Sequence, residues 1–307
     1  MRFTLRQLSY FIAAGETGSV TRAAESVNIS QPSVSAAIAH LEKEFGVQLF
    51  VRQHAQGLSL TPAGERLLQA ARKSLRSAQD LYDLAGDMAG VVSGQINVGT
   101  FRTFGALIIP ELWRSFTEIY PDVQIRLTAG NEAELMEQLR KARIDVALTY
   151  QVHLADDMQF LPLAELPTYV LLAADHPLAD RSSLNLAELA ADPFVLLDLP
   201  LSRQYMLSLF ERSGLTPKII AESGDVAMLR SLVAAGIGYS LMTSRPLNMR
   251  AENDRPLVYV PLEGDQAPLV IGLASLKDMQ RTRLVNAFED HCRDTIVPGN
   301  IPGMRSF

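Results

Sequence analysis

A single long helix is predicted from Pro62 to about Ala89. Its seam of apolar and small residues steps by three and four along the chain, at Leu68, Ala71, Leu75, Ala78, Tyr82 and Ala85. Small residues on alternate layers permit two such helices to pack closely, which favours a dimerising linker. A helix buried along its own domain is the alternative. In either case this helix separates a short N-terminal part from a longer C-terminal part.

The residues before the long helix predict three short helices and a hairpin. The expected elements are a helix from Leu5 to Ala14 ended by Gly15 and Gly18, one from Val20 to Val27 capped by Ser19, one capped by Ser30 with Pro32 in its first turn, and two strands from Val47 to Leu60 around Gln56-Gly57. The third helix has its apolar stripe at Val34, Ile38, Leu41 and Phe45.

The face of the third helix that points away from this stripe carries little bulk. Its residues are Pro32, Ala36, Ala39, His40 and Lys43, flanked by Ser33 and Ser35. A helix that enters the major groove of DNA needs small residues and hydroxyl donors at its N-terminal turn. A helix built from good helix formers with a serine cap is the alternative, and the spacing alone does not separate the two.

Several motifs follow one another at fixed spacing over about 45 residues, namely Ala23-Ala24, Ser30-Gln31-Pro32-Ser33-Val34-Ser35, Ile38, Leu41-Glu42, Phe45-Gly46, Leu49-Phe50, Arg52 and Leu60-Thr61-Pro62-Ala63-Gly64. Together they resemble the winged helix-turn-helix of LysR-type transcriptional regulators. The resemblance implies that the third helix reads DNA. The residues implied at the DNA are Ser19, Ser30, Gln31, Pro32, Ser33, Ser35 and Arg52 of the wing. Many family members carry an arginine where this chain has Ala36, so one contact is missing there.

The C-terminal part alternates strands and helices. Strands are expected at Gln95–Thr100, Val123–Leu127, Ile144–Thr149, Tyr169–Ala174, Phe194–Leu197, Lys218–Ala221, Leu257–Leu262 and Leu269–Ala274, with helices between them and a last helix to about Arg293. Successive βαβ units predict parallel sheets. We expect the strands at Leu257–Leu262 and Leu269–Ala274 to return to the first set, which would make two lobes. The short stretch Gly236-Ile237-Gly238 predicts a tight turn.

We therefore expect an α/β protein with an N-terminal winged helix-turn-helix. The predicted divisions are residues 1–61 for the DNA-binding domain, classed as an all-α winged helix-turn-helix, 62–90 for the long dimerisation or linker helix, 91–94 for a hinge, 95–296 for a two-lobe α/β domain similar to periplasmic binding proteins, and 297–307 for a tail that is disordered or packed against a partner. The resemblance to LysR-type regulators extends to the two-lobe part and implies that it binds a small-molecule effector.

Ligands of such lobes sit at the carboxyl ends of parallel strands, where helix N-termini favour an anion. The candidate effector residues are Thr100, Arg102, Thr103, Thr128, Gln151, Ser202 and Arg203, and the same position at a strand end also selects Tyr150 beside Gln151. Hydroxyls at the start of the helix near Phe104 suit a carboxylate, and Arg102 or Arg203 adds a positive charge. A solvated surface arginine is the alternative for Arg102.

The charge of the chain is distributed unevenly. The whole chain has a net charge of −6; residues 1–90 carry 9 basic and 8 acidic residues, and the remainder carries 19 basic and 26 acidic residues. The acidic balance belongs to the C-terminal part, so it does not exclude nucleic acid as a partner of the N-terminal part. The near-neutral N-terminal part predicts modest non-specific affinity, so tight binding to double-stranded DNA needs a dimer or a tetramer.

Catalytic and metal-binding motifs are absent from the sequence. The single cysteine, Cys292, excludes an internal disulfide and is expected to be a structural or surface thiol in a reducing compartment. The histidines His40, His54, His153, His176 and His291 lack metal-ligand spacing, and no G-x-S-x-G or phosphate-binding loop occurs. We expect no enzyme, no metal and no cofactor.

No membrane segment is predicted, because no apolar stretch reaches the roughly 18 residues that a transmembrane helix needs. The first residues imitate an export leader, but the apolar core from Leu8 to Ala14 is short and contains Ser9. A cytoplasmic transcriptional regulator is therefore the leading hypothesis. A transport-type solute-binding protein is the alternative that the two lobes alone would support equally well.

Overall fold

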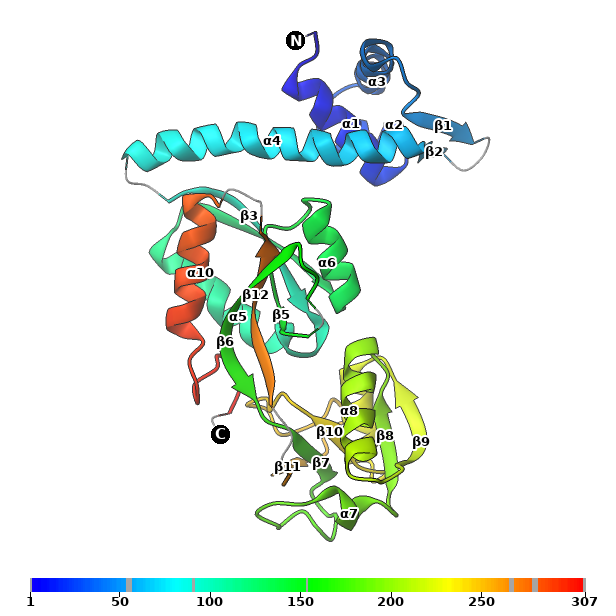
Figure 1. Cartoon of the computed structure of the whole chain (residues 1–307), viewed down its shortest axis with the longest axis vertical. Helices are drawn as coiled ribbons and strands as arrows, with labels where there is room; N and C mark the ends of the chain where they lie inside the picture. Colours follow the sequence, from blue (N-terminus) through cyan, green and yellow to red (C-terminus); the bar gives the residue numbers. More distant parts are fainter. Residues whose placement is uncertain are drawn as a thin grey trace. The chain divides into compact units, whose positions relative to one another are not determined.

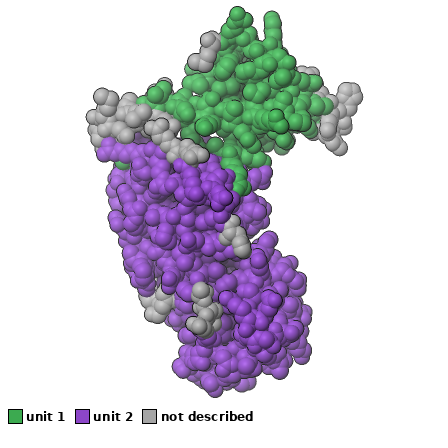
Figure 2. All heavy atoms as spheres, in the orientation of Figure 1, with its two compact units in different colours: residues 1–92, 140–143 green, residues 93–139, 144–307 purple. Residues whose placement is uncertain are grey.

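The chain forms two compact units, residues 1–92 with 140–143 and residues 93–139 with 144–307, which are coloured separately in Figure 2. The computed structural model describes residues 2–53, 57–89, 92–152, 154–264, 268–277 and 281–305, and of residues 52, 53, 79, 80 and 82–89 it describes the backbone alone. Figure 1 labels most of the helices and strands of both units.

The N-terminal unit contains helices and one two-stranded hairpin. In chain order its elements are α1 (Leu5–Thr17), α2 (Val20–Ser26), α3 (Gln31–Phe45), β1 (Phe50–Gln53), β2 (Gly57–Leu60) and α4 (Pro62–Ala89). The strands pair antiparallel, with Phe50 opposite Leu60. This arrangement confirms the predicted winged helix-turn-helix, in which the β1–β2 hairpin is the wing and α4 is the predicted long helix.

The core of this unit forms where α1, α3 and α4 meet. Phe11, Val34 and Leu41 are fully buried in it, which confirms the stripe predicted for α3. Gly15 was expected to end the first helix, but it lies inside α1. The position that a Cβ of Gly15 would occupy lies 3.2 Å from the side chain of Leu68, so the missing side chain lets α4 pack closely on α1. Gly18, with a left-handed φ of 60°, ends α1.

The helix caps follow the sequence expectation in part. The Ser19 hydroxyl accepts a hydrogen bond from the backbone N–H of Arg22 and caps α2, as predicted. Ser30 stands at the N-cap position of α3, as predicted, but its side chain makes no cap bond. Its hydroxyl lies 2.8 Å from the Ser33 hydroxyl instead. Pro32 occupies the first turn, where its missing N–H costs nothing.

The C-terminal unit begins with a lobe built on a five-stranded sheet, which we call lobe I. Its elements are β3 (Gly94–Phe101), α5 (Arg102–Ile119), β4 (Val123–Gly130), α6 (Glu132–Arg140), β5 (Val146–Tyr150), β6 (Met158–Leu166), β12 (Leu269–Leu276) and α10 (Arg283–Thr295). The strand order is β4-β3-β5-β12-β6, in which β3 runs parallel to β4 and β5, and β12 runs antiparallel to β5 and β6. The parallel part is the predicted βαβ pair.

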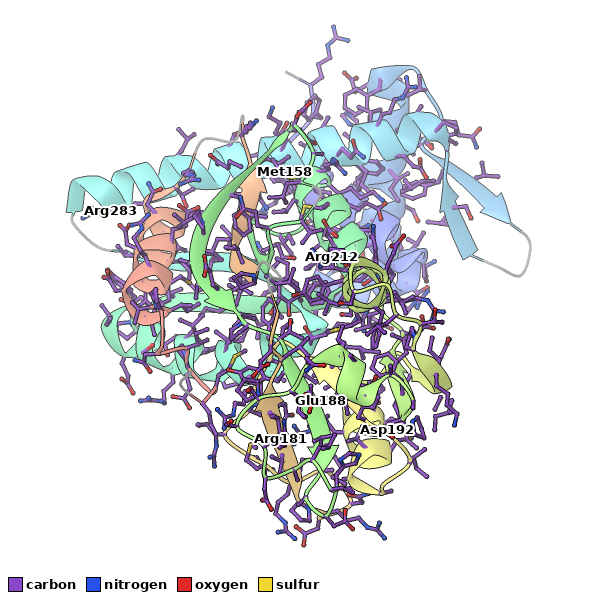
Figure 3. All side chains as sticks on the ribbon, turned by 60° about the horizontal axis from the view of Figure 1, so that its bottom comes forward. Met158, Arg181, Glu188, Asp192, Arg212 and Arg283 are labelled. Carbon is purple, nitrogen blue, oxygen red and sulfur yellow. The ribbon has the colours of Figure 1, made fainter. Side chains whose placement is uncertain are left out.

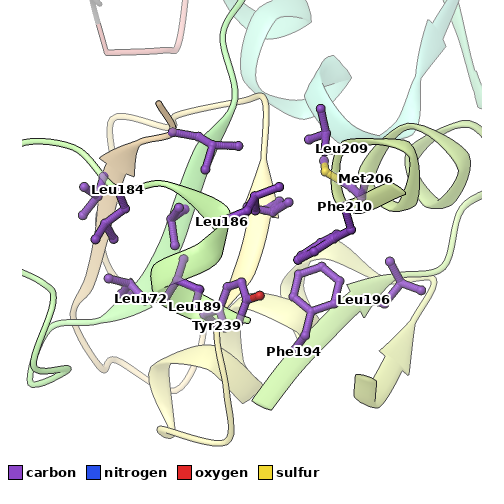
Figure 4. Close-up of a cluster of buried hydrophobic side chains, with 14 residues drawn as sticks. Leu172, Leu184, Leu186, Leu189, Phe194, Leu196, Met206, Leu209, Phe210 and Tyr239 are labelled. Carbon is purple, nitrogen blue, oxygen red and sulfur yellow. The ribbon is translucent and has the colours of Figure 1, made fainter. Parts of the chain in front are cut away.

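Lobe II lies between β6 and β12 in the sequence. Its elements are β7 (Tyr169–Ala173), α7 (Leu186–Leu189), β8 (Pro193–Leu197), α8 (Pro200–Arg212), β9 (Lys218–Ser223), α9 (Val226–Ala234), β10 (Ser240–Met242) and β11 (Leu257–Pro261). Its core is a buried cluster around Phe194, Phe210 and Tyr239 (Figure 4). Arg181 and Glu188, both labelled in Figure 3, form an ion pair at 3.1 Å beside α7.

Two strand assignments differ from the sequence prediction. The strand predicted at Leu257–Leu262 does not return to the first sheet, because β11 pairs antiparallel with β7 in lobe II. The return is made by β12 alone. The sequence also gave no indication of β6, an edge strand that contains Pro162. Proline is tolerated in an edge strand because the side without a neighbouring strand needs no backbone N–H donor. Its presence makes the segment look unlike a strand in the sequence.

The predicted tail packs on its own domain. Ile301 and Met304 are buried, and the backbone N–H of Arg305 donates to the carbonyl oxygen of Arg245 over 2.9 Å. Gly303 has a φ of 72° and lies so close to α5 that a Cβ there would overlap the carbonyl oxygen of Leu107. Residues 297–307 were expected to be disordered or packed against a partner. This expectation is wrong for the described residues 297–305, because buried apolar side chains and the close approach of Gly303 to α5 hold them on their own domain.

Candidate functional site

The outward face of α3 has the small, polar character that the sequence predicted. Gln31, Pro32 and Ser33 are exposed at the first turn, and Ser35 is half-buried behind them. Ala36 and Ala39 continue the exposed face without bulk. The first turn contains no acidic residue, so the positive end of the helix dipole is not neutralised there. Such a turn can approach a phosphate backbone or base edges closely.

The acidic residue Glu42 of α3 serves the fold. Its Oε1 accepts hydrogen bonds from the backbone N–H groups of Leu49, at 2.8 Å, and Phe50, at 3.3 Å. These bonds fix the start of the wing to α3. The backbone of Arg52 lies in β1 opposite Leu58, while its side chain lies outside the described part of the structure.

The two lobes of the C-terminal unit enclose a cavity of about 800 Å³, which we call the interlobe cavity. Thr100, Arg102 and Thr103 line it from lobe I, at the end of β3 and the start of α5. Leu199, Asp225 and Val226 line it from lobe II. The expectation that ligands bind at the carboxyl ends of parallel strands therefore locates the lobe I side of this cavity from the sequence.

Thr100 is 6% exposed, and its hydroxyl oxygen has no hydrogen-bond partner among the described residues. It lies under the first turn of α5, where a Cβ on Gly105 would come within 2.5 Å of the hydroxyl oxygen. The N-cap residue Phe101 offers no side-chain acceptor to this turn. A buried hydroxyl without a partner beside uncapped N–H groups is suited to a ligand acceptor group.

The arginines chosen from the sequence are both paired with carboxylates. Arg102 lies 3.1 Å from Glu134, and the guanidinium of Arg203 contacts Asp198 at 2.9 Å and Glu222 at 3.0 Å. Arg203 and Ser202 do not line the interlobe cavity, and neither does Thr128. Gln151 lines a different cavity of about 710 Å³ beside the crossovers between the lobes.

Three further residues belong to the site or its surroundings, and two of them, Arg230 and Tyr259, were missed from the sequence. Tyr150 is buried at the end of β5, and its hydroxyl bonds those of Thr103 and Thr243. Arg230 of α9 and Tyr259 of β11 line the interlobe cavity. Tyr150 was selected from the sequence together with Gln151, because both stand at the carboxyl end of a predicted parallel strand. Nothing in the local sequence marks Arg230 or Tyr259.

The described residues contain no group of histidine, cysteine and acidic side chains that could hold a metal ion. Cys292 is fully buried on α10, and burial raises the pKa of its thiol, so it is a structural thiol. His54 and His153 lie outside the described residues. Among the helices that were described, none is long and apolar enough to cross a membrane.

Comparison with known proteins decides the family. A family model described as "LysR substrate binding domain" matches residues 89–296, and one described as "Bacterial regulatory helix-turn-helix protein, lysR family" matches residues 5–65. The chain belongs to the LysR family of transcriptional regulators. It is therefore a DNA-binding regulator with an effector-binding domain, and the family consists of regulators, not enzymes. A transport-type solute-binding protein does not account for the N-terminal match.

Individual relatives agree with this assignment. The HTH-type transcriptional regulator CfxR of Cupriavidus necator is 31% identical over 80% of this chain and 77% of its own length. A putative LysR family regulator from Pseudomonas aeruginosa, the PA01 protein, is 37% identical with a TM-score of 0.65, covering 96% of this chain and 99% of that one. CbnR, solved in complex with its target DNA, has the same fold at 24% identity and a TM-score of 0.66, covering 95% and 99%.

Proposed function

We propose that this chain is a ligand-responsive regulator whose α3 enters the major groove and whose interlobe cavity binds a small-molecule effector. The observation that carries the proposal is the bare first turn of α3, where exposed Gln31, Pro32 and Ser33 stand without an acidic neighbour. Glutamine can pair with adenine, and serine hydroxyls can bond bases or phosphates. CbnR, a protein of the same fold, has been solved with its target DNA, which supports this use of the domain.

Self-association through α4 is part of the proposal. Leu68 and Ala71, the first residues of the predicted seam, are buried within their own unit. Leu75 and Ala78 are half-buried, and the nearby Leu81 is 67% exposed. The side chains of Tyr82 and Ala85 lie outside the described part. The described side chains of Leu75, Ala78 and Leu81 therefore offer apolar surface to a second copy, and a dimer or tetramer would hold two recognition helices at a fixed half-site spacing.

Ligand control of DNA bending completes the proposal. An effector bound between the lobes would change their closure, and with it the angle between DNA-binding pairs. Bending a site costs on the order of 1–6 kcal/mol by elastic estimates, so a modest difference in ligand affinity between two conformations can switch it. Footprinting with and without the effector should show a changed protected length or bend; identical footprints would refute this part of the proposal.

The DNA contact is tested by a gel shift with the intergenic DNA upstream of the protein's own gene. A specific shift should be lost in the double variant Gln31→Ala with Ser33→Ala. A matched control is Gln204→Ala with Ser182→Ala, which removes the same side chains from exposed positions of lobe II. If the α3 variant binds as tightly as the control, α3 does not read this DNA.

A further inference from the structure

The interlobe cavity contains a positive charge that is not neutralised by an ion pair. Arg230 is 6% exposed and lines the cavity from α9. Its guanidinium donates to the Tyr259 hydroxyl and to the backbone carbonyl oxygens of Asn248, at 3.1 Å, and Arg250, at 2.7 Å. All of these acceptors are neutral. Among the described residues no carboxylate lies within ion-pair distance of Arg230, whereas Arg102 has one such carboxylate and Arg203 has two.

A buried cation without a carboxylate is costly, because neutral acceptors compensate its lost hydration only in part. The other charged side chains that line the cavity do not provide the counter-ion. Asp225 is used as the N-cap of α9 and accepts from the N–H of Ala227 at 2.8 Å. Glu252 also lines the cavity, but it is exposed and forms no ion pair with Arg230. The positive charge is therefore available to a ligand.

Tyr259 adds a second donor beside Arg230. Its hydroxyl oxygen accepts from Arg230, so its own hydrogen is directed elsewhere, and no acceptor for it is found among the described residues. The side chain is 3% exposed, and burial raises the pKa of Tyr259 to about 12, so the phenol keeps its proton at neutral pH. A guanidinium next to a phenol O–H suits the two oxygens of a carboxylate.

The rest of the cavity is predominantly apolar. Its carbon-rich lining comes from both lobes, at Leu107, Ile109, Pro110, Leu127, Leu199 and Met242. A ligand held at Arg230 therefore lies against hydrocarbon on both sides, with the unpartnered hydroxyl of Thr100 as a further polar point in lobe I. One uncompensated cation and an apolar lining fit a single anionic group on an apolar body.

We propose that Arg230 and Tyr259 bind the carboxylate of a monocarboxylic acid whose aliphatic or aromatic body fills the interlobe cavity. The proposal rests on the proposed function, since it names the chemical class of the effector. It also moves the anion site from the arginines of the predicted strand ends to a residue of α9 in lobe II. Arg230 could instead only hold residues 248–250 in place, and the experiment separates the two roles.

The experiment measures thermal stabilisation of the full-length protein by acids and by their uncharged amides. The probes are benzoate with benzamide, phenylacetate with phenylacetamide, and hexanoate with hexanamide. At least one acid should raise the Tm of the wild-type protein while its amide does not. The affinity for that acid should fall about tenfold or more in Arg230→Gln and in Tyr259→Phe, because each change removes a donor to a charged group. It should stay unchanged in Arg203→Gln, which lies outside the cavity.

Tyr259→Phe keeps both carbonyl bonds of Arg230, so it remains informative if Arg230→Gln does not fold. No stabilisation by any acid, equal stabilisation by acid and amide, or unaltered affinity in Tyr259→Phe would overturn the proposal. Operator binding by gel shift is measured on the same samples. Retained operator binding without an acid response refutes only the ligand assignment, whereas a wild-type protein that binds no operator refutes the proposed function.

Discussion

The hydroxyl oxygens of Tyr150 and Thr243 lie 2.9 Å apart, and this pair joins the end of β5 in lobe I to the residue that follows β10 in lobe II. The Thr103 hydroxyl lies 3.4 Å from Tyr150 on the other side. Burial raises the pKa of Tyr150, so the phenol stays neutral. Thr103 also lines the interlobe cavity. The three hydroxyls therefore form a contact between lobe I and lobe II that begins at the cavity wall.

Removing the phenol oxygen should weaken this connection. Tyr150→Phe leaves the buried hydroxyls of Thr103 and Thr243 without their shared partner, so we expect a loss of about 1–3 kcal/mol in the free energy of unfolding. Urea denaturation of the full-length protein measures the loss. In a double-mutant cycle with Thr243→Val the two changes should be coupled, since both remove the same bond. Additive losses would show that the bond contributes no stability.

The packing of residues 297–305 against α5 gives a second prediction. Gly299 and Gly303 both have positive φ, at 79° and 72°, but a Cβ meets nothing within 4 Å at Gly299 and overlaps the Leu107 carbonyl at Gly303. Gly299→Ala should therefore cost only the left-handed strain of about 1–2 kcal/mol. Gly303→Ala should cost clearly more, because the segment must also leave α5. Equal free energies of unfolding for the two variants would mean that the contact with α5 is not stabilising.

The sequence predicted those parts of the fold that depend on local periodicity. The β3-α5-β4-α6-β5 series follows from alternating strands and amphipathic helices, and α4 follows from its long seam. The partner of each strand was harder to predict, because β11 and β12 have similar apolar patterns and only tertiary packing assigns them to different lobes. Strand β6 was not predicted because it contains Pro162, which is unusual in a strand. Proline is acceptable there because β6 lies at the edge of the sheet, and that position depends on the tertiary fold.

The candidate site was predictable to a similar extent. Thr100 and Thr103 follow from their place at a strand end, which a sequence reveals. The pairing of Arg203 with Glu222 does not, because the partner lies 19 residues away and is brought there by folding. Arg230 stands in an apolar helix, where one arginine resembles a solvent-facing residue. Its burial arises from Tyr259 and from residues 248–250, which a reading of the helix alone cannot include.

The bare position Ala36 supports a prediction about DNA affinity. Ala36 is exposed on the outward face of α3. Ala36→Arg should add a base or phosphate contact, tighten binding to operator and non-specific DNA, and steepen the slope of log affinity against log salt by about 1. Fluorescence anisotropy over a salt series measures the slope. Ala133→Arg adds the same charge to an exposed site of α6 and should leave it unchanged. Equal slopes for the two variants would argue against Ala36 facing DNA.

The packing of α10 on α5 predicts a pH dependence of stability. His291 Nε2 lies 2.8 Å from the Ser115 Oγ, and burial lowers the pKa of this histidine. Above the ordinary histidine pKa of about 6.5 the ring is neutral in both the folded and the unfolded chain, so it contributes no pH dependence there. As the pH falls below that value, the unfolded chain binds a proton that the folded chain resists, and the folded state loses stability.

His291→Gln removes this titration while keeping a polar side chain at the position. The decrease in Tm between pH 7.5 and pH 5.5, about one unit on either side of the ordinary histidine pKa, should therefore be smaller in the variant than in the wild-type protein. If His291→Gln shows the wild-type decrease, protonation of His291 does not destabilise the contact between α5 and α10, and the acid sensitivity of this domain arises from other groups.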